Sequence, residues 1–172
     1  MIEKDIHLTD KQIEFLEAIE QYPVTFFGGA KGGGKSYGLR TIMLIRAWSI
    51  PNLASAIFRR TYEELEANHI RRLFQENPEL NQYYHKTEHL LSLPNGSTME
   101  FCHCRTESDL DLYQGREFDD LGVDEVGQWP EGMFQTLRGS NRTSKAGITP
   151  RTILTGNPGG IGHKWLKRLF VE

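Results

Sequence analysis

The chain has 172 residues, of which 25% are charged and 38% hydrophobic, and a formal net charge of −3 at pH 7. A chain of this size fits one domain that buries about 70% of its unfolded surface, so neither disulfides nor a structural metal is needed for stability. The composition argues against a membrane protein, because no apolar run approaches about 20 residues, and against a strongly basic nucleic-acid surface, although a local basic patch stays open. The first ten residues, MIEKDIHLTD, are too acidic and polar for a signal peptide, and we expect a cytoplasmic protein.

The N-terminal part predicts a helix, a strand, a loop and a second helix. Thr9 can cap the first helix, whose apolar residues recur at helical spacing until Pro23 ends it. The apolar run 24–27 predicts a buried strand, and the spacing of apolar residues in 36–45 predicts a helix.

The loop between them, GGAKGGGKS over 28–36, carries the strongest functional signal. It fits the spacing G-x-x-x-x-G-K-[ST] of a phosphate-binding loop, and the flanking strand and helix supply the context that this motif requires. Glycines let successive backbone N–H groups face phosphate oxygens, and the following helix N-terminus adds partial positive charge. Lys35 is expected to reach the β- and γ-phosphates, and the Ser36 hydroxyl is expected to bind Mg²⁺. The nucleotide-binding residues predicted in this segment are Gly29, Ala30, Lys31, Gly32, Gly33, Gly34, Lys35, Ser36 and Tyr37.

The next part of the chain predicts a strand and a helix. The run 54–58 predicts the second strand, which closes on Arg59-Arg60. Thr61 and Glu64 fit a capping box, which predicts a helix over 62–74.

Residues 89–104 predict a β-hairpin insertion, because two alternating runs flank the turn PNGS. The second run carries Cys102 and Cys104 on one face, a placement that does not favour a disulfide. Zinc binding with His85 and His89 is an alternative, but we expect two reduced thiols.

The remaining elements complete an alternation of strands and helices. Strands are expected over 118–123 and 151–155, a helix from Pro130, and a last helix over 163–170. This alternation predicts an α/β fold with a mostly parallel sheet flanked by helices on both faces.

The pair Asp124-Glu125 follows the strand 118–123, at the edge of the sheet where ligands bind in open α/β folds. Asp124 is expected to hold the metal and Glu125 to act as the general base toward water. An acidic pair at a strand end is also common as a cap or turn, so the upstream loop is what favours a site. At the next strand end, Asn157 can sense the γ-phosphate or belong to an ordinary turn.

Four segments resemble, in this order, the ATPase domain of the large subunit of tailed-bacteriophage terminases, the DNA-packaging motor. The resemblance covers nearly the whole chain. It implies a P-loop NTPase fold of the ASCE type, in which the catalytic glutamate stands beside the metal-binding aspartate. It also implies one ATPase domain over 1–172, whose final elements can be missing, without the family's nuclease domain. The four segments are LTDKQ (8–12), GGAKGGGKS (28–36), YQGREFDDLGVDE (113–125) and ILTGNP (153–158).

The resemblance assigns further roles. It implies that Gln12 contacts adenine and that 155–157 form the coupling segment, with Thr155 at the nucleotide and Asn157 catalytic. Lys31 stands where the family commonly has an arginine finger; it keeps the charge but loses the planar fork, and a solvated loop lysine is the alternative. Gln114 replaces a second common arginine, so a finger for a neighbouring subunit is expected from Arg116 or elsewhere.

The resemblance also implies a biological role. The chain is expected to be a magnesium-dependent ATPase that moves double-stranded DNA into a procapsid, with the portal protein and small terminase subunit as partners. It is expected to be a monomer in isolation and a ring on the portal, acting in the host cytoplasm without nuclease activity. Two other interpretations stay open: a helicase- or recombinase-like ATPase, and a prophage remnant that binds nucleotide without turnover.

Overall fold

The computed structural model describes residues 5–29, 34–157 and 159–171. In these residues the chain forms a seven-stranded sheet with the strand order β1-β7-β6-β2-β5-β4-β3. Neighbouring strands from β1 to β5 are parallel, and β4 and β3 extend the sheet antiparallel. The strands are β1 (Val24–Gly28), β2 (Ala54–Arg59), β3 (Tyr84–His85), β4 (Leu90–Ser92), β5 (Thr98–His103), β6 (Asp120–Val123) and β7 (Arg151–Gly156).

The register of the parallel strands brings three candidate functional segments to one edge. Gly28 of β1 lies opposite Gly156 of β7, and Val123 of β6 lies opposite both Leu154 of β7 and Phe58 of β2. Because parallel strands end at the same edge, the glycine loop, the acidic pair and the segment after β7 all leave the sheet there. The predicted α/β fold with a mostly parallel sheet is confirmed.

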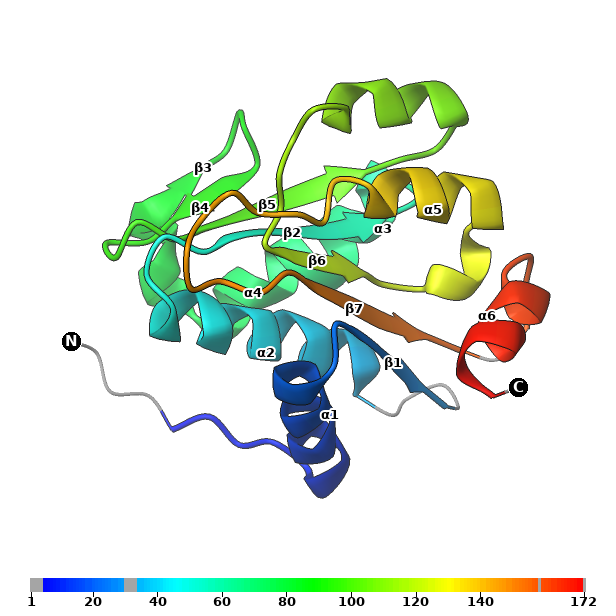
Figure 1. The fold of residues 1–172 in the computed structure, drawn as a ribbon. Helices are drawn as coiled ribbons and strands as arrows, with labels where there is room; N and C mark the ends of the chain where they lie inside the picture. The colour runs from blue at the N-terminus through cyan, green and yellow to red at the C-terminus, as the bar shows by residue number, and fades with distance from the viewer. Residues whose placement is uncertain (1–4, 30–33, 158, 172) are drawn as a thin grey trace.

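Helices cover both faces of the sheet, and Figure 1 shows α2 and α5 on opposite sides of it. One core lies between the sheet and α1, α2 and α4, and the other lies between the sheet and α5, α6 and η3. A Cβ at Gly122 in β6 would lie 2.4 Å from the Met43 sulfur, so glycine allows α2 to approach the sheet closely. The helices are α1 (Asp10–Gln21), α2 (Lys35–Ser49), α4 (Arg71–Glu76), η3 (Glu107–Tyr113), α5 (Glu131–Arg138) and α6 (His163–Phe170).

The helix predicted over 62–74 differs in the structure, because its middle turn is π-helical. α3 (Tyr62–Leu65) passes into η1 (Glu66–Ile70), and α4 follows directly. Thr61 does cap α3, accepting from the Glu64 amide at 3.3 Å, but the Glu64 carboxylate lies 3.5 Å from Arg59. Of the two hydrogen bonds of the predicted capping box, the structure shows the one from the Glu64 amide to the Thr61 side chain. The helix also contains one π-helical turn.

The hairpin is confirmed, with Ser92 of β4 opposite Thr98 of β5. The two-residue strand β3 was not predicted, because so short a segment shows no alternation.

Cys102 and Cys104 are buried free thiols, as expected, and no group of three or more His, Cys, Asp or Glu side chains able to hold a metal occurs among the described residues. Nor does any helix in the described part of the chain have the length and apolar character needed to cross a membrane. Short 3-10 helices η2 (Pro78–Tyr83) and η4 (Val126–Gln128) complete the described elements.

Candidate active site

The two ends of the glycine loop have backbone conformations that favour glycine. Gly29 has φ +146° and Gly34 has φ +70°. Gly34 is the N-cap residue of α2, and its carbonyl accepts a hydrogen bond from the Gly38 amide at 2.8 Å. The predicted phosphate-binding residues between them, Ala30, Lys31, Gly32 and Gly33, lie outside the described residues.

Gln12 supports the end of this loop. Its Nε2 donates to the Gly34 carbonyl at 3.0 Å, and a Cβ at Gly34 would lie 2.8 Å from that nitrogen. Gln12 also completes a capping box with Thr9 at the start of α1, because its Oε1 accepts from the Thr9 amide at 2.9 Å. Gln12 is therefore buried and fixed from both sides, while the adenine contact assigned to it stays a prediction.

The first residues of α2 reach the acidic pair across the edge of the sheet. Lys35 is buried at the start of the helix. The Ser36 hydroxyl donates to Oδ2 of Asp124 at 2.9 Å, over a sequence separation of 88 residues. The two predicted metal ligands are thus in direct contact.

Among the described residues, four side chains form hydrogen bonds with the Asp124 carboxylate. Besides Ser36, its Oδ2 accepts from Arg59 Nη1 at 2.9 Å and lies 2.7 Å from His69 Nε2, and its Oδ1 accepts from the Thr155 hydroxyl at 2.6 Å. Burial alone would raise the pKa of Asp124. The hydrogen bond to His69, the charge of Arg59 and the hydrogen bond from Thr155 outweigh burial and hold this pKa far below its usual value.

The oxygen donors at this place fit magnesium. A hydroxyl and one carboxylate are the hard ligands that Mg²⁺ prefers, and this ion usually completes its shell with water and substrate phosphates rather than with a protein cage. Ser36 and Asp124, which are in direct contact, are the residues that would hold this ion. Arg59 shares the same carboxylate oxygen, so its charge acts directly on this place.

Glu125 has the features of a general base. Its backbone is left-handed, with φ 50° and ψ 47°, a strained conformation for a residue of this type that is concentrated at functional sites. Burial raises the pKa of its carboxyl group, and the neighbouring Asp124 adds to the shift, while Arg59 and Lys35 oppose it. A carboxylate with a raised pKa accepts a proton from water more readily than an ordinary surface carboxylate.

The end of β7 contributes two polar side chains on different partners. The Thr155 side chain is fully buried, and its hydroxyl donates a hydrogen bond to Asp124. The structure therefore places Thr155 in contact with the candidate metal ligand Asp124. Asn157 Nδ2 lies 3.5 Å from Glu125 Oε1. Among the described residues, the buried Oδ1 of Asn157 has no hydrogen-bond partner, which leaves an acceptor beside the candidate base.

Arg116 is not brought to this site. Its guanidinium pairs with Glu100 and lies 5.1 Å from the ring centroid of Phe118. It lines a cavity of about 270 Å³ with Ala54 and Thr98, the first residues of β2 and β5, at the opposite edge of the sheet. A catalytic contact within its own subunit is not supported by this position, and a contact in a neighbouring subunit stays a prediction.

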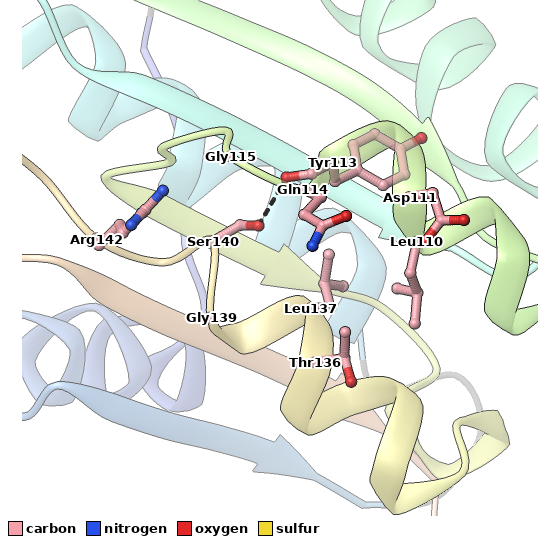
Figure 2. A pocket seen from close by; sticks show the side chains of 10 residues that line it. All are labelled: Leu110, Asp111, Tyr113, Gln114, Gly115, Thr136, Leu137, Gly139, Ser140 and Arg142. Carbon is pink, nitrogen blue, oxygen red and sulfur yellow. Dashed lines mark hydrogen bonds between the residues drawn. The ribbon is translucent and has the colours of Figure 1, made fainter.

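Gln114, at the other finger position, also faces away from the site. It lines a cavity of about 310 Å³ between η3 and the end of α5, and Figure 2 shows its side chain pointing into that cavity beside Leu137. Two residues that line this cavity are joined by a hydrogen bond, in which the Ser140 hydroxyl donates to the Tyr113 carbonyl at 3.0 Å.

Tyr37, predicted to bind nucleotide, is half-buried in the first turn of α2, and its nucleotide contact stays a prediction. It lines a cavity of about 250 Å³ with Asp5, Ile6 and Glu76, and its ring centroid is 5.8 Å from the guanidinium carbon of Arg40.

Sequence reasoning missed Arg59 and His69 as members of this site. Arg59 was recognised only as the end of a strand, although its place at the end of β2, next to the strand of the acidic pair, was the available signal. His69 gave no signal, because its contact depends on the π-helical turn.

Comparison with known proteins identifies the fold. No protein-family model matches the sequence, and no curated protein matches it either. The large terminase of a thermophilic bacteriophage superposes with a TM-score of 0.70 at 17% identity, over 96% of this chain and 43% of that one. The large terminase of bacteriophage HK97 gives 0.67 at 15% identity, over 90% and 34%.

The chain has the fold of a large terminase ATPase domain. The ATPase domain of the Thermus phage P74-26 large terminase, taken alone, superposes with a TM-score of 0.61 at 16% identity, over 96% of this chain and 75% of that domain. The chain therefore spans less than half of the first two large terminases and most of an isolated ATPase domain. Among the similar structures are complexes of the first of these terminases with ATP-γ-S and with ADP.

Proposed function

We propose that this chain is the ATP-hydrolysing motor domain of a viral large terminase subunit, which drives double-stranded DNA into a procapsid. The observation that carries the proposal is the junction of the loop and the acidic pair, where Ser36 contacts Asp124 and Glu125 follows in a strained conformation. The fold shared with terminase ATPase domains, and the nucleotide complexes of one of them, support the same function.

In this proposal the residues of the chain divide the work. Backbone N–H groups of the loop and the Lys35 ammonium bind the phosphates. Ser36 and Asp124 would hold Mg²⁺, which supplies charge neutralisation at the β- and γ-phosphates when it is bound. Glu125 takes a proton from the attacking water, and the Oδ1 of Asn157, which has no hydrogen-bond partner among the described residues, offers that water a second contact. Thr155 and Arg59 keep the Asp124 carboxylate in place.

The proposed motor function and the terminase-like fold support a set of partners for this domain. We propose that the domain works in a ring assembled on the portal, with double-stranded DNA and the small terminase subunit, in the cytoplasm of the bacterial host. In such a ring, Lys31 and a residue from the neighbouring subunit supply positive charge to the developing phosphoryl transition state.

The test is Mg²⁺-dependent release of phosphate from ATP by the purified chain. Glu125→Gln is expected to lower kcat at least a hundredfold, the contribution of a general base, which is about 10²–10⁴. Glu17→Gln, the same substitution at an exposed position of α1, is the matched control and is expected to keep the parent rate. A Glu125→Gln variant with the parent rate would contradict the assignment of the base, and unwinding stimulated by single-stranded DNA would favour a helicase instead.

A further inference from the structure

The π-helical turn η1 places one histidine inside the candidate site. His69 is fully buried, and its Nε2 lies 2.7 Å from Oδ2 of Asp124. A π-helical turn contains an extra residue, which changes the direction of the side chains after it, and such turns often occur at functional sites. Without the wide turn, the helix would present a different side chain to Asp124.

The partners of His69 indicate which ring nitrogen carries the proton. Its Nδ1 lies 3.3 Å from Arg40 Nη1, and a guanidinium group only donates hydrogen bonds. The two hydrogens of Nη1 are shared among Nδ1 and the carbonyls of Asn68 and Ser36, an arrangement that favours Nδ1 as an acceptor. The ring is then the neutral form with its proton on Nε2, and this N–H donates to Asp124.

Arg40 is itself held rigidly. Its Nε and Nη2 donate to the two Glu76 carboxylate oxygens at 3.2 and 2.6 Å, and its Nη1 donates to the Asn68 carbonyl at 2.8 Å. Arg40 is buried in α2, one turn after Ser36, whose carbonyl accepts from Nη1 at 3.4 Å. A chain of hydrogen bonds thus runs from Glu76 through Arg40 and His69 to the carboxylate that Ser36 also contacts.

We propose that His69, with its tautomer fixed by Arg40, is a positioning residue that orients the Asp124 carboxylate for the metal. This inference rests on the proposed function. The geometry supports it because the Ser36 hydroxyl, which donates to Asp124, is also the proposed second ligand of the metal, whereas the His69 ring contacts the carboxylate alone. His69 and Thr155 are both fully buried and reach different carboxylate oxygens, and with Arg59 on the same oxygen as His69 they keep the carboxylate in one orientation.

A histidine that only filled space would have a different effect from a positioning residue. Loss of packing lowers stability wherever it occurs in the core, whereas loss of the Nε2–H donor changes how Mg²⁺ affects nucleotide binding. His69→Leu removes the donor, His69→Gln keeps an amide donor of similar reach, and Leu73→Ala is a matched control. Leu73 is fully buried in α4 and has no hydrogen-bonding side chain to offer Asp124.

The experiment is equilibrium binding of a fluorescent ADP analogue, titrated with Mg²⁺, in variants shown to be folded by circular dichroism. We expect His69→Leu to raise the Mg²⁺ concentration for half-maximal effect at least tenfold, with affinity in EDTA within twofold of the parent. His69→Gln is expected to stay within threefold of the parent, and Leu73→Ala to match it. In parallel, nitrogen chemical shifts of ¹⁵N-histidine-labelled protein without nucleotide are expected to show His69 protonated on Nε2 alone.

The outcomes separate this inference from the proposed function. If the parent binds the analogue, and His69→Leu needs the same Mg²⁺ concentration as the parent for half-maximal effect, the positioning role alone would be overturned. The same holds if Leu73→Ala loses the response as strongly, or if His69 carries its proton on Nδ1. A parent protein that binds no nucleotide would overturn the proposed function, and the positioning role with it.

Discussion

A buried ion pair between α2 and β6 predicts a large loss of stability from one small substitution, Asp120→Asn. Arg46 of α2 donates from Nε and Nη2 to the two carboxylate oxygens of Asp120, at 2.6 and 3.1 Å. The Asp120 side chain is fully buried and that of Arg46 is 5% exposed. The same guanidinium also pairs at 2.5 Å with Glu20, whose side chain is 58% exposed. Two carboxylates therefore share one arginine and differ mainly in burial.

The difference in burial sets the magnitudes. Removing one partner of a buried ion pair costs about 3–5 kcal/mol when the other charge is left buried without compensation, and here Arg46 keeps only its exposed partner Glu20. Burial raises the pKa of Asp120 although Arg46 opposes the shift, so part of the attraction is offset by desolvation. We therefore expect Asp120→Asn to lower the free energy of unfolding by about 3 kcal/mol, the lower end of that range. Glu20→Gln should cost about 1 kcal/mol or less, as is usual for exposed pairs.

Urea unfolding of the parent and both variants at neutral pH measures this difference, provided that the slopes of the transitions agree. In thermal unfolding, about 3 kcal/mol corresponds to about 6–12 °C in Tm for a chain of this size. If Asp120→Asn and Glu20→Gln were equally destabilising, or if both lay within about 1 kcal/mol of the parent, the burial argument would be refuted.

Two further predictions concern the thiols and the glycine loop. Burial raises the pKa of Cys102 well above its usual value and that of Cys104 to about 12, so Ellman's reagent at pH 8 should react with both only after unfolding; fast reaction of either thiol in the folded protein would contradict this. Lys31→Ala should lower kcat and kcat/KM together by at least about tenfold with nucleotide affinity nearly unchanged, and Lys31→Arg should keep or raise the rate. An alanine variant that fails only through lost affinity would make Lys31 a binding residue.

The succession of strands and helices along the chain could be predicted because the sequence signals that mark these elements are local. The glycine spacing, the capping residue Thr9 and the turn between β4 and β5 each specify backbone geometry within a few residues. The meeting of Ser36 with Asp124 could also be predicted. Asp124 directly follows β6 and Ser36 lies at the start of α2, the helix that follows β1, and the ends of parallel strands share one edge.

The surroundings of Asp124 could not be predicted, because they depend on tertiary packing. A π-helical turn has no sequence signature of its own, so His69 looked like any polar helix residue. Arg116 was proposed as a finger for a neighbouring subunit because Gln114 replaces an arginine that is common in the family. It lies before the four residues of β6, at the opposite edge of the sheet from the acidic pair of its own chain. Nearness along a chain is a poor guide when a strand lies between two residues.

The most direct test of the central claim is thermal unfolding with and without Mg²⁺ and ATP-γ-S. At about one hundred times Kd, a ligand that binds only the folded state adds about 2.7 kcal/mol, or about 5–10 °C in Tm for a chain of this size. The parent and Glu125→Gln should show this shift and Lys35→Ala should not, because only Lys35 is assigned a phosphate contact. The same shift in folded Lys35→Ala, or none in the parent at millimolar nucleotide, would contradict the claim that the segment 28–36 binds phosphate.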